Sequence, residues 1–325
     1  MAAKIIDGEA IAKTLTDKVA ADAKQMAHAG RPPHLVAVQV GENPASKIYT
    51  NMQQKNCQAA GIEYELLNID ESISQDDLLT RIDQLNKNPK VTGIILQMPV
   101  PPQIDARKVQ VAISPAKDVE GMHPENMGRL FYGGGLVSPC TAAAAVELLK
   151  QTSPDLAGKE AVVVGHSEIV GKPIAMMLLQ SLRESPTVTV CHIATRDLAA
   201  HTRRADILFV AAGASQAKWQ GYSRRKKTGE AVELPDLSPL ISADMVKKGA
   251  IVIDVAINRI PKGFDENGEP LKNDKGKTHM QTVGDVDFQG AKEKVAAITP
   301  VPGGVGPMTV AMLLTNTIAC AKAMA

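Results

Sequence analysis

The sequence predicts an α/β protein with two domains. Its 325 residues exceed the usual size of one domain, and 44% hydrophobic with 22% charged residues is typical of a globular protein. Short runs rich in Val and Ile alternate with longer segments whose apolar residues recur every three or four positions. This alternation indicates parallel strands joined by helices that cover both faces of a sheet.

The first half of the chain alternates helix and strand. Apolar residues recur at helical spacing from 11 to 26, and a β-rich run follows at 34–41. Asn43 can cap a second helix, Pro44 suits its first turn, and Gly61 suits a left-handed exit. We then expect a strand at 62–69, a helix at about 76–86 and a strand at 91–100.

The second half contains a strand, a glycine-containing turn and a helix within residues 156–180, after a helix that begins at Ser138 or Pro139. Gly165, Ser167 and Gly171 form the turn, where glycines let the backbone approach a pyrophosphate. Their spacing departs from GxGxxG, so the motif depends on its context. Further strands at 187–196, 205–213 and 249–258 supply that context and indicate a Rossmann-type sheet.

The residues after the second strand of this sheet bear on the choice of cofactor. An NAD enzyme usually places an acid there to bind the ribose hydroxyls, but this chain has Arg196. Arg196, together with His166, favours the 2′-phosphate of NADP, with NAD as the alternative. An ordinary surface charge explains Arg196 equally well.

Composition excludes several classes of function. The formal net charge is +1 and aromatic residues are 3%, which disfavours partners such as nucleic acid or a membrane surface. The four cysteines lie far apart, and no metal-binding motif occurs, so we expect buried thiols and no metal site. Without a long apolar run, the sequence predicts a soluble, cytoplasmic protein that binds small molecules.

Several polar segments have two interpretations. Gln97 lies at the carboxyl end of a strand, where α/β sheets place ligands, but polar residues at strand ends are also common. The acids of segment 117–130 suit a polar ligand, although residues alone favour a solvated loop. We expect surface loops or hairpins at 216–241 and 262–281, and we assign them no role.

Nearly the whole chain resembles the methylenetetrahydrofolate dehydrogenase/cyclohydrolase (FolD) family. The resemblance rests on several motifs in a fixed order, which are SKIYTNMQQKNCQAAGI, GIILQMPVP, KDVEGMHPENMGRL, SPCTA, VVVGHSEIVGKP, IVIDVAIN, VGDVDF and TPVPGGVGPMTVAMLL. It implies NADP-dependent oxidation of 5,10-methylenetetrahydrofolate to 5,10-methenyltetrahydrofolate in one-carbon metabolism and purine biosynthesis. It also implies hydrolysis of the product to formyltetrahydrofolate, and a homodimer.

The resemblance also implies a division of the chain. Residues 1–139 with 298–325 correspond to a three-layer α/β folate-binding catalytic domain, and 140–297 to the Rossmann domain, with the active site in a cleft between them. On the folate side it points to Tyr49, Gln97 and the loop residues Pro302, Gly303, Gly304 and Val305. On the cofactor side it points to Gly165, His166, Ser167, Gly171, Arg196 and Ile257.

Two departures from the family pattern concern the chemistry. The family has a lysine four residues after its tyrosine, where this chain has Gln53, and Lys55 lies about 120° away around the helix. Glutamine cannot exchange a proton at neutral pH, so we expect weak or absent cyclohydrolase activity. Glu120 replaces the second aspartate of KDVDG, keeping the charge that would bind the pterin but adding a methylene.

Hydride transfer depends less on the missing lysine, because the protein mainly orients the two reactants. We therefore expect a dehydrogenase with Tyr49, Gln53, Gln97 and Glu120 in its active site. Three alternatives stay open, namely a fully bifunctional enzyme, a non-catalytic folate or nucleotide-binding homologue, and an enzyme for a related pterin carrier.

Overall fold

The computed structural model describes residues 3–42, 44–266 and 268–324, except for the side chains of 44–49. The chain forms two compact units. The six-stranded unit comprises Met1–Glu9 and Ala145–Pro307, and the three-stranded unit comprises Ala10–Ala144 and Met308–Ala325. The two-domain α/β fold predicted from the sequence is confirmed.

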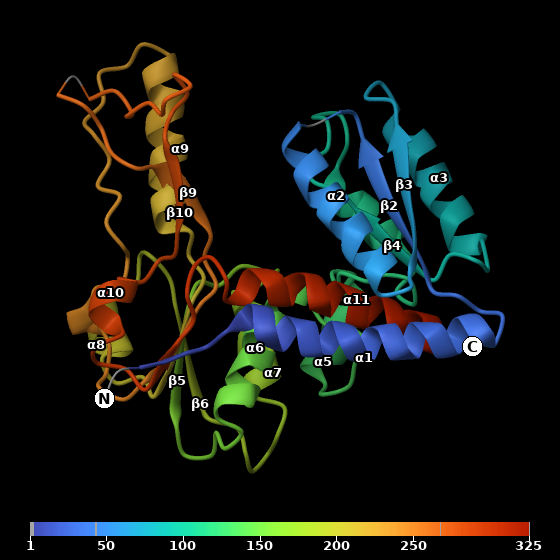
Figure 1. Cartoon of the computed structure of the whole chain (residues 1–325), viewed down its shortest axis with the longest axis horizontal. Helices are drawn as coiled ribbons and strands as arrows, with labels where there is room; N and C mark the ends of the chain where they lie inside the picture. Colours follow the sequence, from blue (N-terminus) through green and yellow to red (C-terminus); the bar gives the residue numbers. More distant parts are fainter. Residues whose placement is uncertain (1–2, 43, 267, 325) are drawn as a thin grey trace. The chain divides into compact units, whose positions relative to one another are not determined.

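The three-stranded unit is built on a parallel sheet in the order β3-β2-β4. Its strands are β2 (His34–Val40), β3 (Glu63–Ile69) and β4 (Gly93–Leu96). Its helices are α1 (Gly8–His28, continuing from the other unit), α2 (Pro44–Ala59), α3 (Gln75–Lys87), α4 (Ala106–Ala112), α5 (Pro124–Phe131), the first part of α6 (Cys140–Thr152) and most of α11 (Val305–Ala323). Figure 1 shows α2 on one face of this sheet and α3 on the other.

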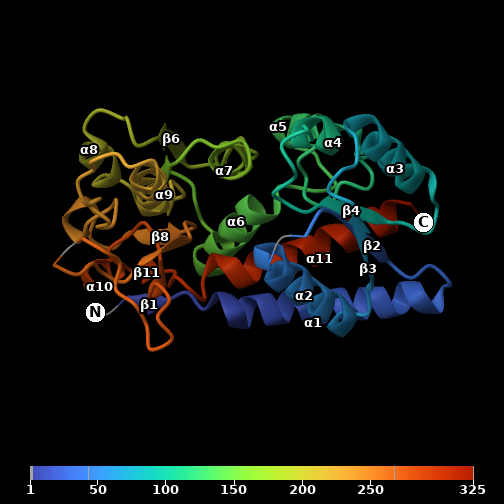
Figure 2. The same cartoon turned by 90° about the horizontal axis from the view of Figure 1, so that it is seen from above.

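The alternation of side chains along β2 decides which residues face each helix. Val36, Val38 and Val40 point to one face and form a core with Leu78 and Ile82 of α3. The alternate residues of β2 point to the opposite face, where α2 packs on β3. Helices α1 and α11 run side by side (Figures 1 and 2), and an ion pair joins Asp22 to Lys322 at 2.8 Å.

The six-stranded unit contains a parallel sheet in the order β1-β11-β8-β7-β5-β6, and an antiparallel pair of β9 with β10. The central strands are buried on both faces, as Val- and Ile-rich parallel strands require. Its strands are β1 (Lys4–Ile5), β5 (Glu160–Val164), β6 (Thr187–Cys191), β7 (Ile207–Val210), β8 (Ile251–Asp254), β9 (Asn258–Pro261), β10 (Met280–Val283) and β11 (Ala297–Ile298).

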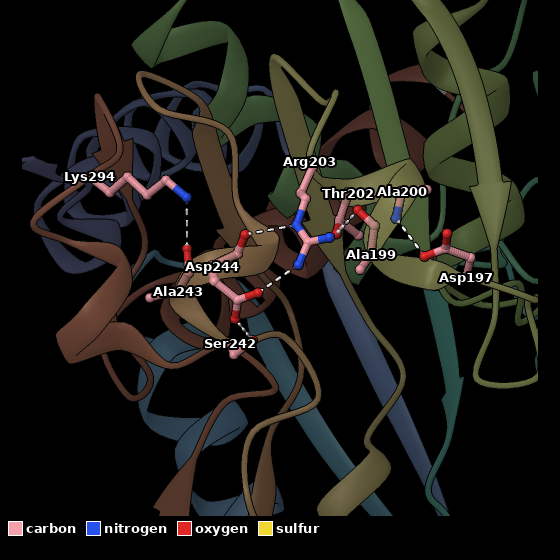
Figure 3. A network of polar contacts seen from close by, with 9 residues as sticks. All are labelled: Asp197, Ala199, Ala200, Thr202, Arg203, Ser242, Ala243, Asp244 and Lys294. Carbon is pink, nitrogen blue, oxygen red and sulfur yellow. Dashed lines mark hydrogen bonds and ion pairs between the residues drawn. The ribbon is translucent and has the colours of Figure 1, made fainter.

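Short helices follow most strands of this sheet. They are α7 (Gly171–Leu178), α8 (Leu198–Thr202), α9 (Ala214–Lys227), the 3₁₀ turn η1 (Ala243–Met245) and α10 (Phe288–Ala291). Figure 3 shows how Arg203, after α8, holds η1, with Nη2 at 2.6 Å from Asp244 Oδ2 and Nε at 3.0 Å from the Asp244 carbonyl oxygen. Lys294 binds the carbonyl oxygen of Ala243 at 3.1 Å, so η1 is fixed from both sides.

The structure corrects our expectation for residues 216–241. The first part is not a loop or hairpin but helix α9, which lies beside β9 and β10 (Figure 1). Tertiary contacts stabilise a helix that has little amphipathic pattern of its own, since the rings of Trp219 and Tyr222 pack with Phe264 at centroid distances of 6.0 and 6.2 Å. The segment 262–281 does contain a hairpin, formed around β9 and β10.

The borders of the compact units differ from our expected domain borders at both ends of the chain. Strands β1 and β11 pair with each other and β11 pairs with β8, so the first residues and 298–307 belong to the six-stranded unit. Neither two-residue strand has a signal in the sequence. Within the part of the chain that the structure describes, no helix is long and apolar enough to span a membrane.

Candidate active site

Gln53 and Gln97 are brought together in the three-stranded unit. Gln97 follows β4 and is buried, and its Nε2 donates a hydrogen bond to Gln53 Oε1 of α2 over 2.9 Å. The hydroxyl of Tyr64 on β3 donates to the same Gln53 oxygen over 3.3 Å. Two residues expected at the site are therefore in contact, and Tyr64 joins them although no motif in the sequence points to it.

Gln39 lies on the same face of this sheet. Tyr64 is paired with Leu35, and Gln39 lies four residues further along β2, so both side chains point toward α2. Gln39 is 5% exposed, its Nε2 donates to the carbonyl oxygen of Gly41, and its Oε1 has no partner among the described residues. A polar residue within the apolar run HLVAVQV is the signal in the sequence that points to this position.

Glu120 lies on a loop whose course is tightly fixed. A Cβ on Gly121, which has φ +69°, would lie 2.5 Å from the carbonyl carbon of Ser138, so only glycine fits. Asp118 accepts hydrogen bonds from the His123 N–H at 2.7 Å and from Asn126 Nδ2 at 3.0 Å, which secures the preceding turn. Burial, and then the charge of Asp118, raise the pKa of Glu120 to about 7.

The glycine turn after β5 shows the close backbone packing that a dinucleotide site requires. A Cβ on Gly171 would lie 1.9 Å from the carbonyl oxygen of Gly165, and one on Gly165 would lie 2.4 Å from that of Ala211. Ser167 Oγ accepts a hydrogen bond from the Val170 N–H at 3.2 Å, and α7 begins at Gly171. The turn and the start of α7 therefore pack backbone against backbone, as the close approach of a dinucleotide requires.

His166 in this turn meets His192, which follows β6. Their rings lie edge to face with centroids 4.9 Å apart, and both side chains are exposed. Arg196 is also exposed and lies beyond the same strand, although no contact joins it to the two histidines. His166 therefore follows the carboxyl end of β5, and His192 and Arg196 follow the carboxyl end of the neighbouring strand β6.

Two buried carboxylates hold the segment that carries Ile257. Asp254 accepts hydrogen bonds from the N–H groups of Ala256, Asp285 and Val286. Asp285 in turn accepts one from Asn258 Nδ2 at 3.0 Å. Because its neighbours on both sides are fixed, Ile257 is held with 55% of its surface exposed. Burial raises the pKa of Asp254 to about 7, and the charge of Asp285 adds to this effect.

A cavity of about 150 Å³ in the six-stranded unit brings Ile257 together with the expected loop. The loop packs against the start of α1, where the Gly8 N–H donates to the carbonyl oxygen of Gly303 at 3.0 Å. The expected loop residues that line the cavity are Pro302, Gly303, Gly304 and Val305. Tyr49 belongs to α2, but its side chain lies outside the described residues.

Sequence comparisons identify the family. Residues 6–120 match the family model described as tetrahydrofolate dehydrogenase/cyclohydrolase, catalytic domain. Residues 139–219 and 236–325 match the NAD(P)-binding domain of the same description. The chain belongs to the tetrahydrofolate dehydrogenase/cyclohydrolase family. The part between the two matched segments, 220–235, contains the end of α9 and the loop after it.

Relatives in this family match over almost their full length. The bifunctional protein FolD of Geotalea daltonii is 43% identical over 320 residues, covering 98% of this chain and 99% of that protein. The solved structure of the bifunctional FolD enzyme from Campylobacter jejuni is 38% identical, with a TM-score of 0.81 and 99% of both chains covered. The FolD structure from Trypanosoma brucei, complexed with NADP cofactor and inhibitor, is 32% identical with a TM-score of 0.81, covering 99% of this chain and 98% of that one.

These findings confirm several predictions made from the sequence. The FolD family resemblance is correct, and the chain is an oxidoreductase of folate one-carbon metabolism with a Rossmann-type dinucleotide-binding domain. The expected tetrahydrofolate substrate and nicotinamide dinucleotide cofactor agree with the family.

Proposed function

We propose that this protein oxidises 5,10-methylenetetrahydrofolate to 5,10-methenyltetrahydrofolate with NADP and has little or no cyclohydrolase activity. The observation that carries the proposal is the contact between Gln53 and Gln97, where two neutral amides occupy the positions expected beside the reacting ring. In this assignment the three-stranded unit binds the folate and the six-stranded unit binds the dinucleotide.

Binding and orientation suffice for the oxidation. When bound, the dinucleotide supplies the nicotinamide ring that accepts a hydride. We assign Gln97 and Tyr49 to orientation of the folate, and Glu120 to its pterin. Ile257, which we assign to the nicotinamide, and the loop Pro302–Val305, which we assign to the folate, line one cavity, and together they would exclude water from the reacting rings.

Hydrolysis of the methenyl product needs a group that can take and return a proton. Gln53 has no such proton near neutral pH, and both hydrogen bonds that it accepts come from neutral groups. General acid–base catalysis is typically worth about 10² to 10⁴-fold, so its loss is sufficient to make hydrolysis slow.

The preference for NADP rests on the charge at the glycine turn. Gly165, Ser167 and Gly171 would hold the pyrophosphate, and His166 with Arg196 would face the 2′-phosphate. No carboxylate occupies the stretch from His192 to Arg196, where NAD enzymes carry one. We also propose that the active protein is a homodimer in the cytoplasm.

The test is a spectrophotometric assay of oxidation with NADP and with NAD, followed by hydrolysis of the methenyl product. We expect oxidation with NADP favoured, hydrolysis at the spontaneous rate, and faster hydrolysis in Gln53→Lys. Enzymatic hydrolysis by the unaltered protein would instead establish a bifunctional enzyme. Binding of folate and NADP without turnover would establish a non-catalytic homologue, and turnover only with another pterin would indicate a different carrier.

A further inference from the structure

The chain of hydrogen bonds from Tyr64 to Gln97 runs in one direction. Gln53 Oε1 accepts from the Tyr64 hydroxyl and from Gln97 Nε2. A carboxamide oxygen has two lone pairs, so this oxygen has no further capacity. Burial, and then the Cys57 thiol, raise the pKa of Tyr64, which keeps its proton on the hydroxyl and makes it a donor.

This direction decides which group of Gln97 is available to a ligand. Its Nε2 is engaged with Gln53, which leaves its Oε1 as the group of this amide that a ligand can meet. The amide of Gln97 therefore presents an acceptor. A lysine at position 53 would have the opposite effect, because an ammonium group only donates and would draw the Gln97 carbonyl oxygen to itself.

We propose that Tyr64 is a positioning residue of this site. The Tyr64 hydroxyl donates to Gln53 Oε1 and thereby holds this oxygen where it also accepts a hydrogen bond from Gln97 Nε2. Because its Nε2 is engaged in this way, Gln97 turns its carbonyl oxygen toward an N–H group of the bound ligand. The identity of that ligand as a folate rests on the proposed function; the orientation of Gln97 does not.

Gln39 provides a second observation that points to a ligand with N–H donors. It lies on the same face of the sheet, its Nε2 is used by Gly41, and its buried Oε1 has no partner among the described residues. An unpartnered buried acceptor has lost its hydration without gaining a hydrogen bond, and a ligand donor would restore that bond. Both amides thus present oxygen, so this face matches a ring that carries N–H donors.

The orientation of the Gln97 amide can be measured by NMR, without any assay of enzyme activity. In ¹⁵N-labelled protein, the side-chain amide signals of Gln97 are assigned by their absence in Gln97→Glu. We expect Gln53→Glu, which keeps the acceptor, to leave the Gln97 signals near their original positions. We expect Gln53→Lys to move them to the positions of an unbonded amide, and Tyr64→Phe to shift them part of the way. Unchanged Gln97 signals in both Gln53→Lys and Tyr64→Phe would overturn the proposal.

Kinetics provide the second readout. Loss of one hydrogen bond predicts that Tyr64→Phe raises KM for methylenetetrahydrofolate roughly 3- to 10-fold, with kcat and KM for NADP changed less than about twofold. In a Gln53→Met background, Tyr64→Phe should have no further effect on KM, because the carboxamide oxygen to which the Tyr64 hydroxyl donates is already absent. The matched control is Tyr132→Phe, which removes a hydroxyl from a side chain that is 89% exposed.

The two readouts separate the possible failures. An equal effect of Tyr64→Phe in both backgrounds, or on both substrates, would assign Tyr64 a general structural role and contradict the proposal. If the protein oxidises no folate at all, the proposed function fails, while the NMR signals of Gln97 still decide whether Tyr64 and Gln53 orient it.

Discussion

At the scale of single residues, Gln53 and Glu120, which we interpret as departures from the family pattern, differ chemically. Gln53 loses a titratable group, whereas Glu120 keeps one. The pKa of Glu120 is raised to about 7 by burial and by Asp118, so its ionisation changes within the range where enzymes are assayed. The charge that would hold the pterin is therefore present only in part at neutral pH.

This predicts a pH-dependent affinity for the folate. The carboxylate of Glu120 accepts hydrogen bonds, so KM for methylenetetrahydrofolate should fall as pH rises from 6 to 8, with a limiting slope of about tenfold per unit below the pKa. Steady-state kinetics across this range measure it. Glu120→Gln should have a higher KM that varies little with pH, and the surface variant Glu125→Gln should behave as the unaltered protein. A KM that rises with pH would contradict the assignment of Glu120.

At the scale of elements, the turn between β5 and α7, where we propose that the cofactor binds, is fixed through its backbone. Gly171 begins α7 in contact with Gly165, which has φ +121°, so neither position tolerates a Cβ. By contrast, Gly221 within α9 has no atom near the place of its missing Cβ. Replacing glycine by alanine should therefore destabilise the protein at Gly171 and stabilise it at Gly221.

We expect Gly171→Ala to displace the turn and to cost about 1–3 kcal/mol in the free energy of unfolding, as overpacked sites do. NADP binding, followed by fluorescence titration, should be lost or weakened at least tenfold. The control Gly221→Ala should raise stability by roughly 0.5–1 kcal/mol, because it removes a glycine from a helix interior, and should leave NADP binding unchanged. Normal NADP binding by Gly171→Ala would exclude this turn as the cofactor site.

At the scale of the whole molecule, the buried pair Asp254 and Asp285 links distant segments of the six-stranded unit. Asp254 at the end of β8 accepts backbone hydrogen bonds from the residues that follow β10. Asp285 accepts three from the N–H groups of Ala212, Gly213 and Ala214, at the start of α9. One buried network thus holds the segment of Ile257 and the base of α9.

The raised pKa of Asp254 predicts how stability varies with pH. Its value of about 7 in the folded protein exceeds that of an ordinary aspartate, so its contribution to stability is present at low pH and is lost as pH rises through 7. Thermal unfolding by circular dichroism should show a lower midpoint at pH 8 than at pH 6. Asp254→Asn should reduce this slope and destabilise the protein by about 1–3 kcal/mol, because its amide group meets N–H donors. A midpoint that increases from pH 6 to 8 in the unaltered protein would contradict this reading.

The sequence by itself determined the α/β class, most helices and strands, and the motif residues Gln53, Gln97, Gly165 and Gly171. These follow from local features, since hydrophobic periodicity, glycine and proline positions act over a few neighbouring residues. Short strands β1 and β11 left no such signal, because two residues carry no period. The helix at 214–227 was missed for a related reason, as packing of Trp219 and Tyr222 on Phe264 stabilises it.

Only the tertiary structure decided how the motif residues act on one another. Tyr64, Gln53 and Gln97 come from β3, α2 and the end of β4, and the direction of their hydrogen bonds depends on which atoms the fold brings within 3.3 Å. The same holds for Gln39, whose unpartnered oxygen is defined by its burial, and for Asp254, whose pKa is set by surroundings far away in sequence. A hydrogen bond depends on which two groups meet, and desolvation depends on what surrounds a group. Both are therefore determined by the folded structure and not by the order of the residues.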